Sequence, residues 1–278
     1  MRGFLCGGSQ LFPTLYAEVG DDEEGLGKLC ILKQGHHGGG FVLRQGKRYH
    51  GLVVLIEGFG FKPDVDWVES ELRMPEKRNE MLSRVAKRTL ELNKLHIADH
   101  NMPKRKYIDK YKDGFFECLD LCYRDLYGTV PISKESQAEL VSQFIMILNN
   151  EYLVLICDEN DKVVGFGLCF PGIGDALKKS GGRLTPAALI KLIKIVKNPE
   201  VIDLGLVAIR PEYQNAGINA VILDDLLEVL SKGKVKKCET NLNLESNTAV
   251  RAQWKYFNAR QHKRRRSYKK SMEVSGNA

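Results

Sequence analysis

The segment from Val201 to Leu230 constrains the fold more than any other part of the sequence. Val201–Ile209 is an apolar run rich in β-branched residues, and Pro211 ends it. A turn of mostly small residues, QNAGIN at 214–219, is followed by apolar residues at helical spacing. We therefore predict a strand, a tight turn and a helix. Such a turn directs backbone N–H groups and the positive helix end towards one point, which suits a phosphate group.

The turn resembles the acyl-CoA-binding motif of the GNAT (Gcn5-related) N-acyltransferases, in which a strand precedes a Gln/Arg-x-x-Gly-x-Gly/Ala loop. Gln214 and Gly217 match the motif, whereas Asn219 stands where Gly or Ala is usual. The Asn219 side chain would either crowd a pyrophosphate or hydrogen-bond to it. The resemblance implies that the strand backbone holds pantetheine and that the loop N–H groups hold the pyrophosphate. The residues concerned are Leu206, Val207 and Ala208 in the strand, and Gln214, Asn215, Ala216, Gly217, Ile218 and Asn219 in the loop.

The order of the other predicted elements matches the GNAT arrangement over roughly residues 95–270. Strands are predicted at 95–101, 152–157, 162–170, 235–242 and 262–270, and helices at 104–126, 133–148 and 246–258. This mixed order predicts an α/β (α+β) fold with a mixed central sheet flanked by helices, and it excludes an all-helical or all-β fold.

An insertion before the central strand contains two further helix candidates, 175–180 and 186–196. The second is apolar along one side, at Ala187, Leu189, Ile190, Ile193 and Val196. This stripe favours a helix packed on the sheet, and a lid or wall for an acyl chain or acceptor is the alternative.

We divide the chain into an irregular N-terminal segment (1–50), a linking region (51–93) and a GNAT-like domain (94–278). Residues 1–50 lack sustained periodicity and are predicted to be weakly ordered. In the linking region, LVVLIE and 61–72 are strand candidates, and a helix begins near Pro75.

The Gly60-Phe61 pair followed by a strand resembles the end of a GNAT-like domain. The chain would then correspond to the C-terminal part of a longer protein with a degenerate N-terminal acyltransferase-like domain. A truncated or misread gene start would give this pattern, and an ordinary N-terminal hairpin is the alternative.

Cysteine usage and hydropathy favour a cytoplasmic protein. The seven cysteines are odd in number and scattered, which is typical of reduced thiols. Cys118 and Cys122 lie one helical turn apart, but buried small side chains explain them better than a metal site does. His36 and His37 fit a solvated loop. No apolar run is long enough to span a bilayer, so we expect no membrane partner. No further ligands at useful spacing accompany these cysteines and histidines, so we expect no metal.

The formal net charge of +7 is a local property. Residues 251–270 contain nine Lys and Arg and no acid, which leaves the remainder of the chain close to neutral. Such a run binds phosphates, RNA or DNA, or lies on a solvated face. The run includes only one aromatic residue between 263 and 270, Tyr268, so base stacking has little support.

Amine acylation requires a fixed thioester, a proton acceptor for the amine and a proton donor for the leaving thiolate. The resemblance assigns Tyr256 as the general acid and Asn247 to the cofactor. The alternatives are that Tyr256 packs on the core beside Trp254, and that Asn247 serves the helix N-terminus. Asp203 and Glu239 are the candidate general bases, unless a water relay takes that role.

The sequence therefore predicts an N-acyltransferase that moves an acyl group, with acetyl the first choice, from acyl-CoA to a small-molecule or peptide amine. The alternative is a catalytically silent GNAT-like domain that binds a ligand or nucleic acid through its basic C-terminal segment. Binding of CoA distinguishes the two.

Overall fold

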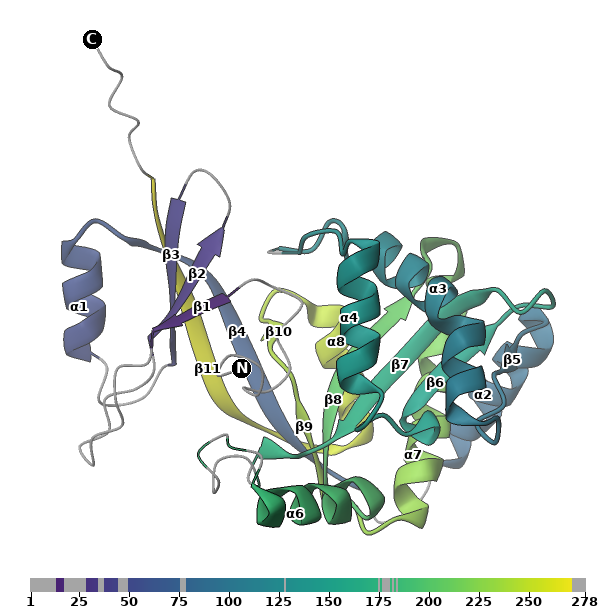
Figure 1. Cartoon of the computed structure of the whole chain (residues 1–278). Coiled ribbons are helices and arrows are strands. Elements are labelled where there is room, and N and C mark those ends of the chain that lie inside the picture. Colours follow the sequence, from purple (N-terminus) through teal and green to yellow (C-terminus); the bar gives the residue numbers. More distant parts are fainter. Residues whose placement is uncertain are drawn as a thin grey trace.

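The computed structural model describes residues 14–17, 29–34, 38–44, 50–75, 79–127, 129–174, 176, 181, 183 and 185–271 (Figure 1). Side chains are described from Val54 to Lys270 within these ranges. The predictions for His36 and His37 and for most of the helix 175–180 lie outside the described residues.

One sheet organises the described chain, with the strand order β1-β2-β3-β11-β4-β9-β8-β7-β6-β5 and with β10 paired to β4. Neighbouring strands are antiparallel, except that β8 and β9 run parallel. The strands are β1 (Thr14–Ala17), β2 (Leu29–Gln34), β3 (Gly38–Arg44), β4 (Lys62–Arg73), β5 (His96–Ile97), β6 (Leu153–Cys157), β7 (Val163–Pro171), β8 (Val201–Ile209), β9 (Lys237–Thr240), β10 (Asn243–Leu244) and β11 (Asn258–Ser271).

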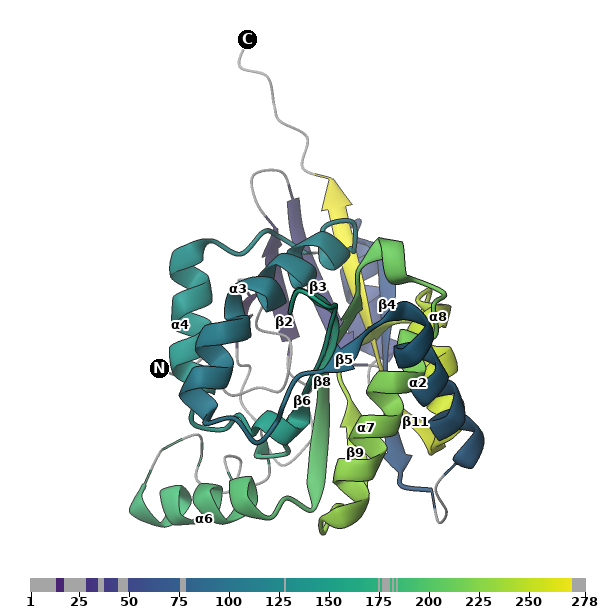
Figure 2. The ribbon, with the colours of Figure 1, turned by 90° about the vertical axis from the view of Figure 1, so that its right-hand side faces the viewer.

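Helices cover both faces of the β5–β8 half of the sheet (Figure 2). α3 and α4 pack on one face through a core that includes Tyr107, Leu155 and Phe166. α2 and α7 pack on the other face, against Val154 and Ile202 among others. The helices are α1 (His50–Gly58), α2 (Glu80–Asn93), α3 (Lys104–Tyr123), α4 (Lys134–Phe144), α6 (Pro186–Lys197), α7 (Ile218–Lys232) and α8 (Thr248–Arg251), with short 3-10 turns η1 (Asn150–Tyr152), η2 (Pro211–Tyr213) and η3 (Ala252–Tyr256).

β4 lies between β9 and β11, so a strand from the linking region is part of the central sheet. Its long pairing with β11 joins residues nearly 200 positions apart, as in the pair Asn258–Arg73. The alternative of a local N-terminal hairpin is therefore wrong for β4. The division of the chain into three regions stays a prediction.

Three predicted elements are wrong in type or extent. LVVLIE forms part of the helix α1 rather than a strand, because a short apolar run has no periodicity that separates the two. The predicted helix 246–258 is one turn of α8 followed by η3, and Asn247 is the N-cap of α8. The predicted strand at 95–101 is reduced to the two residues of β5.

Candidate active site

β8 and β9 separate part of the way along β8. They pair in parallel from Val201 to Leu204, opposite Lys237 to Thr240. After Thr240 the chain leaves β8 and pairs with β4 again as β10. Residues 205–209, which we call the β8 edge, have no neighbour on this side among the described strands. The Asn241 amide donates a hydrogen bond of 3.2 Å to the Gly205 carbonyl at the point of separation. An unpaired strand edge is a natural binding surface for a ligand that carries amide groups.

Side chains at the end of α3 contact the β8 edge. The Tyr123 hydroxyl donates a 3.1 Å hydrogen bond to the Val207 carbonyl, and the Cys122 thiol lies 3.2 Å from the Ile209 carbonyl. Burial raises the pKa of Tyr123 to about 12, so its hydroxyl is protonated at neutral pH. The edge predicted to hold pantetheine therefore has a proton donor beside it.

A β-bulge at Gly205 decides which face each β8 side chain occupies. Leu168 pairs with Leu206 and Cys169 pairs with Leu204, which leaves Gly205 as the extra residue. A Cβ at this position would lie 2.7 Å from the Leu168 carbonyl oxygen, so the close approach of the strands requires glycine. The bulge shifts the alternation, and Asp203 consequently points to the same face as Leu206.

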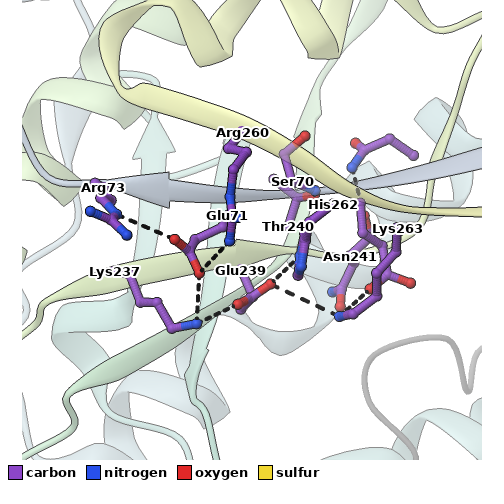
Figure 3. A network of polar contacts seen from close by, with 12 residues as sticks. Ser70, Glu71, Arg73, Lys237, Glu239, Thr240, Asn241, Arg260, His262 and Lys263 are labelled. Carbon is purple, nitrogen blue, oxygen red and sulfur yellow. Dashed lines mark hydrogen bonds and ion pairs between the residues drawn. The ribbon is translucent and has the colours of Figure 1, made fainter.

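Three carboxylates lie side by side on this face. Asp203 is opposite Glu239, and Glu239 is opposite Glu71, across β8, β9 and β4. Figure 3 shows Glu71 and Glu239 held by basic side chains, with Lys237 bridging them at 3.0 and 2.8 Å. Glu239 also contacts His262 at 2.7 Å. Asp203 has no ion pair or hydrogen bond from its side chain to another described residue.

The environments of Glu71 and Asp203 shift the pKa values of these two carboxylates in opposite directions. The hydrogen bond from Lys237 lowers the pKa of Glu71. Burial, and then the charge of Glu239, raise the pKa of Asp203 to about 6. A carboxyl group poised near neutrality is suited to accept a proton, and such shifts are typical of functional sites. Glu239 is held by Lys237 and His262, whereas Asp203 has no such partner among the described residues, so Asp203 is the candidate base that we carry forward.

The loop before α7 has the backbone shape expected of an anion site. Asn215 and Gly217 both have positive φ, 67° and 88°, and α7 begins after Gly217 without a side-chain cap. A Cβ on Gly217 would lie 2.6 Å from the Thr89 hydroxyl of α2, so glycine is required here by conformation and by space. Gln214, Asn215 and Asn219 are exposed, so this loop and the start of the fifteen-residue helix α7 reach the protein surface.

The structure does not bring Tyr256 to the β8 edge. Tyr256 packs against a cluster that includes Leu72 and Ile202, on the face opposite Asp203. Tyr256 comes two residues before Asn258, which lies in the sheet row that runs across Arg73 and β9 to Val201, the first residue of β8. Val207 lies six residues beyond Val201 along β8, so Tyr256 is near the opposite end of that strand. The role of Tyr256 as general acid stays a prediction. Asn247 caps α8 by accepting from the Val250 N–H at 3.2 Å.

The basic run on β11 is paired with carboxylates. Its side chains alternate between the two faces of the sheet and meet the acids of β4 on each face. The ion pairs are Lys263–Glu69 (2.8 Å), Arg265–Glu69 (2.8 Å), Arg266–Asp66 (2.6 Å), Arg264–Glu245 (2.6 Å), Arg264–Asp66 and Lys269–Asp64 (2.7 Å). Lys270 donates to the Phe59 carbonyl. This positive charge is thus largely neutralised within the sheet.

Asp66 is expected to stabilise the fold above about pH 4. Hydrogen bonds from Arg266 and Arg264 lower its pKa from 3.8 to about 2, so this stability is lost as the pH falls from about 4 to 2. We predict that Asp66→Asn lowers the free energy of unfolding at pH 7 by about 1–3 kcal/mol, because two half-buried guanidinium groups lose a partner. Urea denaturation of both proteins measures this change in the free energy of unfolding. Asp109→Asn is the control, because its pair with Lys112 is exposed and contributes little.

Sequence reasoning missed two site residues. Tyr123 lies at the end of an amphipathic helix, where its ring looks like one more core residue. His262 is half-buried beside Glu239, and the strand that carries it is out of register there by one bulge. The local sequence carries no signal for either contact. No cluster of three or more metal-ligating side chains was found among the described residues.

Comparisons with known proteins support the fold. No family model and no curated protein matches the sequence. A GCN5-related N-acetyltransferase from Sphaerobacter thermophilus superposes with a TM-score of 0.52 at 12% identity, over 84% of this chain and 60% of that one. A tandem GNAT protein from the clavulanic acid biosynthesis pathway gives 0.46 at 13% identity (85% and 64% covered). An acetyltransferase of the GNAT family from Colwellia psychrerythraea gives 0.45 at 11% (84% and 65%).

The chain has the GNAT fold, a mixed α/β architecture with a mostly antiparallel open sheet flanked by helices. It spans less than two thirds of the length of each of these three proteins. At such low identity the likeness concerns the fold, and activity has to be argued from the site.

Proposed function

We propose that this protein is an N-acyltransferase that transfers an acyl group, with acetyl as the first candidate, from acyl-CoA to an amine. The observation that carries the proposal is the separation of β8 from β9, with a proton-accepting carboxylate at its base. The separation exposes backbone amides along the β8 edge, and Asp203 lies on β8 just before it.

The residues present fit an acyl-CoA in two respects. The β8 edge offers the Val207 backbone to the amide groups of pantetheine. The 214–219 loop offers N–H groups at the start of α7 to a pyrophosphate, and the positive φ of Gly217, which packs against Thr89 of α2, sets the backbone shape of this turn. The apolar side chains of Leu206 and Ala208 pack into the core and fix the strand.

The reaction places two demands on this chain. The amine nitrogen forms a bond to the thioester carbon, and its proton passes to Asp203 directly or through water. The carbon–sulfur bond then breaks, and the thiolate takes a proton from a nearby donor. We assign that donor as Tyr123, because its hydroxyl lies beside Val207 and stays protonated. The products are an amide and free CoA.

The alternative is a silent GNAT-like domain that binds nucleic acid or another ligand through its basic segment. Ion pairs with β4 neutralise most of that segment, which removes its main support. A domain that binds a ligand but catalyses no reaction remains the alternative. Acyl-CoA binding together with formation of an acylated product distinguishes the enzyme from such a domain.

Acetyl-CoA is expected to raise the unfolding temperature, because a ligand that binds only the folded state stabilises it by mass action. Asn219→Asp tests phosphate binding more cleanly than a substitution at Gly217, because any side chain at Gly217 would also strain the fold. The new carboxylate suits the exposed first turn of α7 and should preserve stability, but it repels a pyrophosphate.

We expect Asn219→Asp to weaken acetyl-CoA binding about tenfold or more, while Asn219→Ala binds at least as tightly as the natural chain. Calorimetry and thermal shift measure both. No shift in the natural chain at millimolar acyl-CoA would contradict the proposal, and equal binding by the Asp variant would move the pyrophosphate away from this loop.

A further inference from the structure

α6 presents apolar side chains to solvent. Leu189, Ile190 and Ile193 are 43%, 57% and 49% exposed, and Ala188 is the buried residue of the helix. The predicted packing of this stripe on the sheet is therefore wrong. α6 lies at the lower edge of the molecule in Figures 1 and 2, apart from α2, α3 and α4. Single exposed apolar residues are ordinary, but a contiguous patch on a projecting helix indicates a contact surface.

Local interactions hold this helix in shape. Thr185 caps it by accepting from the Ala188 N–H at 3.2 Å, and Pro186 occupies the first turn. Its inner side contributes half-buried Leu192, Ile195 and Val196. The outward apolar face is thus a preformed feature and needs no partner in order to form.

Three lysines border the apolar patch. Lys191, Lys194 and Lys197 follow one another at three-residue spacing and lie along one side of α6. All three are exposed, and none has an ion pair with another described residue. The helix itself contains no acidic residue. The surface is therefore apolar in its centre and positive along one border.

We propose that α6 docks this protein on an anionic lipid surface, with its apolar face in the headgroup region and its lysines on lipid phosphates. A helix that combines exposed apolar residues with lysines has the features of an interfacial membrane helix. No described helix is long and apolar enough to cross a bilayer, and the proposal concerns surface binding. A symmetric second copy is a poorer occupant, because it would bring like-charged lysine borders together.

Vesicle co-sedimentation of the full chain tests this docking. We expect binding to phosphatidylcholine vesicles that contain about 30% phosphatidylglycerol, and little binding to phosphatidylcholine alone. Replacing Lys191, Lys194 and Lys197 with Gln should weaken binding by about 100-fold, at about fivefold for each charge. Ile190→Ser with Ile193→Ser should weaken it by about tenfold or more.

The matched control is Met81→Ser with Leu92→Ser on α2, whose side chains are 61% and 70% exposed. It removes comparable apolar surface from another helix and should leave vesicle binding unchanged. Equal loss in this control, or equal binding to neutral vesicles, would overturn the proposal. Absence of binding to the anionic vesicles would also overturn it. If light scattering shows a dimer that the double variant Ile190→Ser with Ile193→Ser dissociates, the α6 surface binds a second copy of the chain instead. Acetyl-CoA binding, measured on the same variants, should not change, which keeps this test separate from the proposed function.

Discussion

Asp203→Asn is expected to lower the rate of acyl transfer by about 10²–10⁴-fold while leaving acyl-CoA affinity nearly unchanged. The amide keeps the shape of the side chain but cannot accept the proton of the amine. In the natural chain, kcat/KM should rise with pH through about 6, the pKa to which burial raises Asp203, provided that the acceptor's own ionisation is corrected for. The variant should lack this ionisation. A variant with full turnover and the same pH profile would remove Asp203 as the base.

The same substitution is expected to stabilise the fold at alkaline pH. Because the folded pKa of Asp203 is raised from 3.8 to about 6, the folded state holds its proton more tightly than the unfolded state does. The natural chain therefore loses stability as the pH rises from about 4 to 6, and stays destabilised above that range. We expect Asp203→Asn to raise the free energy of unfolding at pH 8 by about 1–3 kcal/mol, after discounting for partial exposure.

Glu239→Gln is the matched comparison, since Glu239 is the neighbouring carboxylate and the other candidate base. Lys237 would lose an ion pair and His262 would lose a close polar contact, so we expect lower stability, opposite in sign to Asp203→Asn. Urea denaturation of both variants at pH 5 and pH 8 separates the two carboxylates. Stabilisation by both changes would show that crowding of negative charge, and not the burial of Asp203, dominates this site.

The sequence predicted the elements that have strong periodicity. The β8–turn–α7 unit, the strands β6 and β7, and the helices α2 and α3 follow from apolar spacing and caps, with ends shifted by a few residues. Local pattern suffices there because each element buries one continuous face. α6 shows the limit of this reasoning, because the same apolar stripe is expected both of a helix packed in the core and of a helix whose apolar face is exposed for binding.

Other features depend on strands that are distant in sequence. The facing of Asp203 could not be fixed because the bulge at Gly205 changes the alternation of β8, and the bulge exists only against β7. The basic run on β11 looked like a binding surface because its acidic partners lie about 200 residues earlier, on β4. Charge in sequence thus predicts a surface only when the pairing of its strand is known.

The variants Tyr123→Phe and Tyr256→Phe together identify the general acid. Tyr123→Phe is expected to lower turnover by about 10²–10⁴-fold with acyl-CoA affinity little changed, because it removes the hydroxyl beside Val207. Tyr256→Phe should change turnover by less than about threefold, since its ring packs on the opposite face and away from the β8 edge. Each change removes one oxygen and keeps the ring, so stability should fall by about 1 kcal/mol at most. The reverse result would restore Tyr256 as the acid, and full turnover in both variants would leave water as the proton donor to the thiolate.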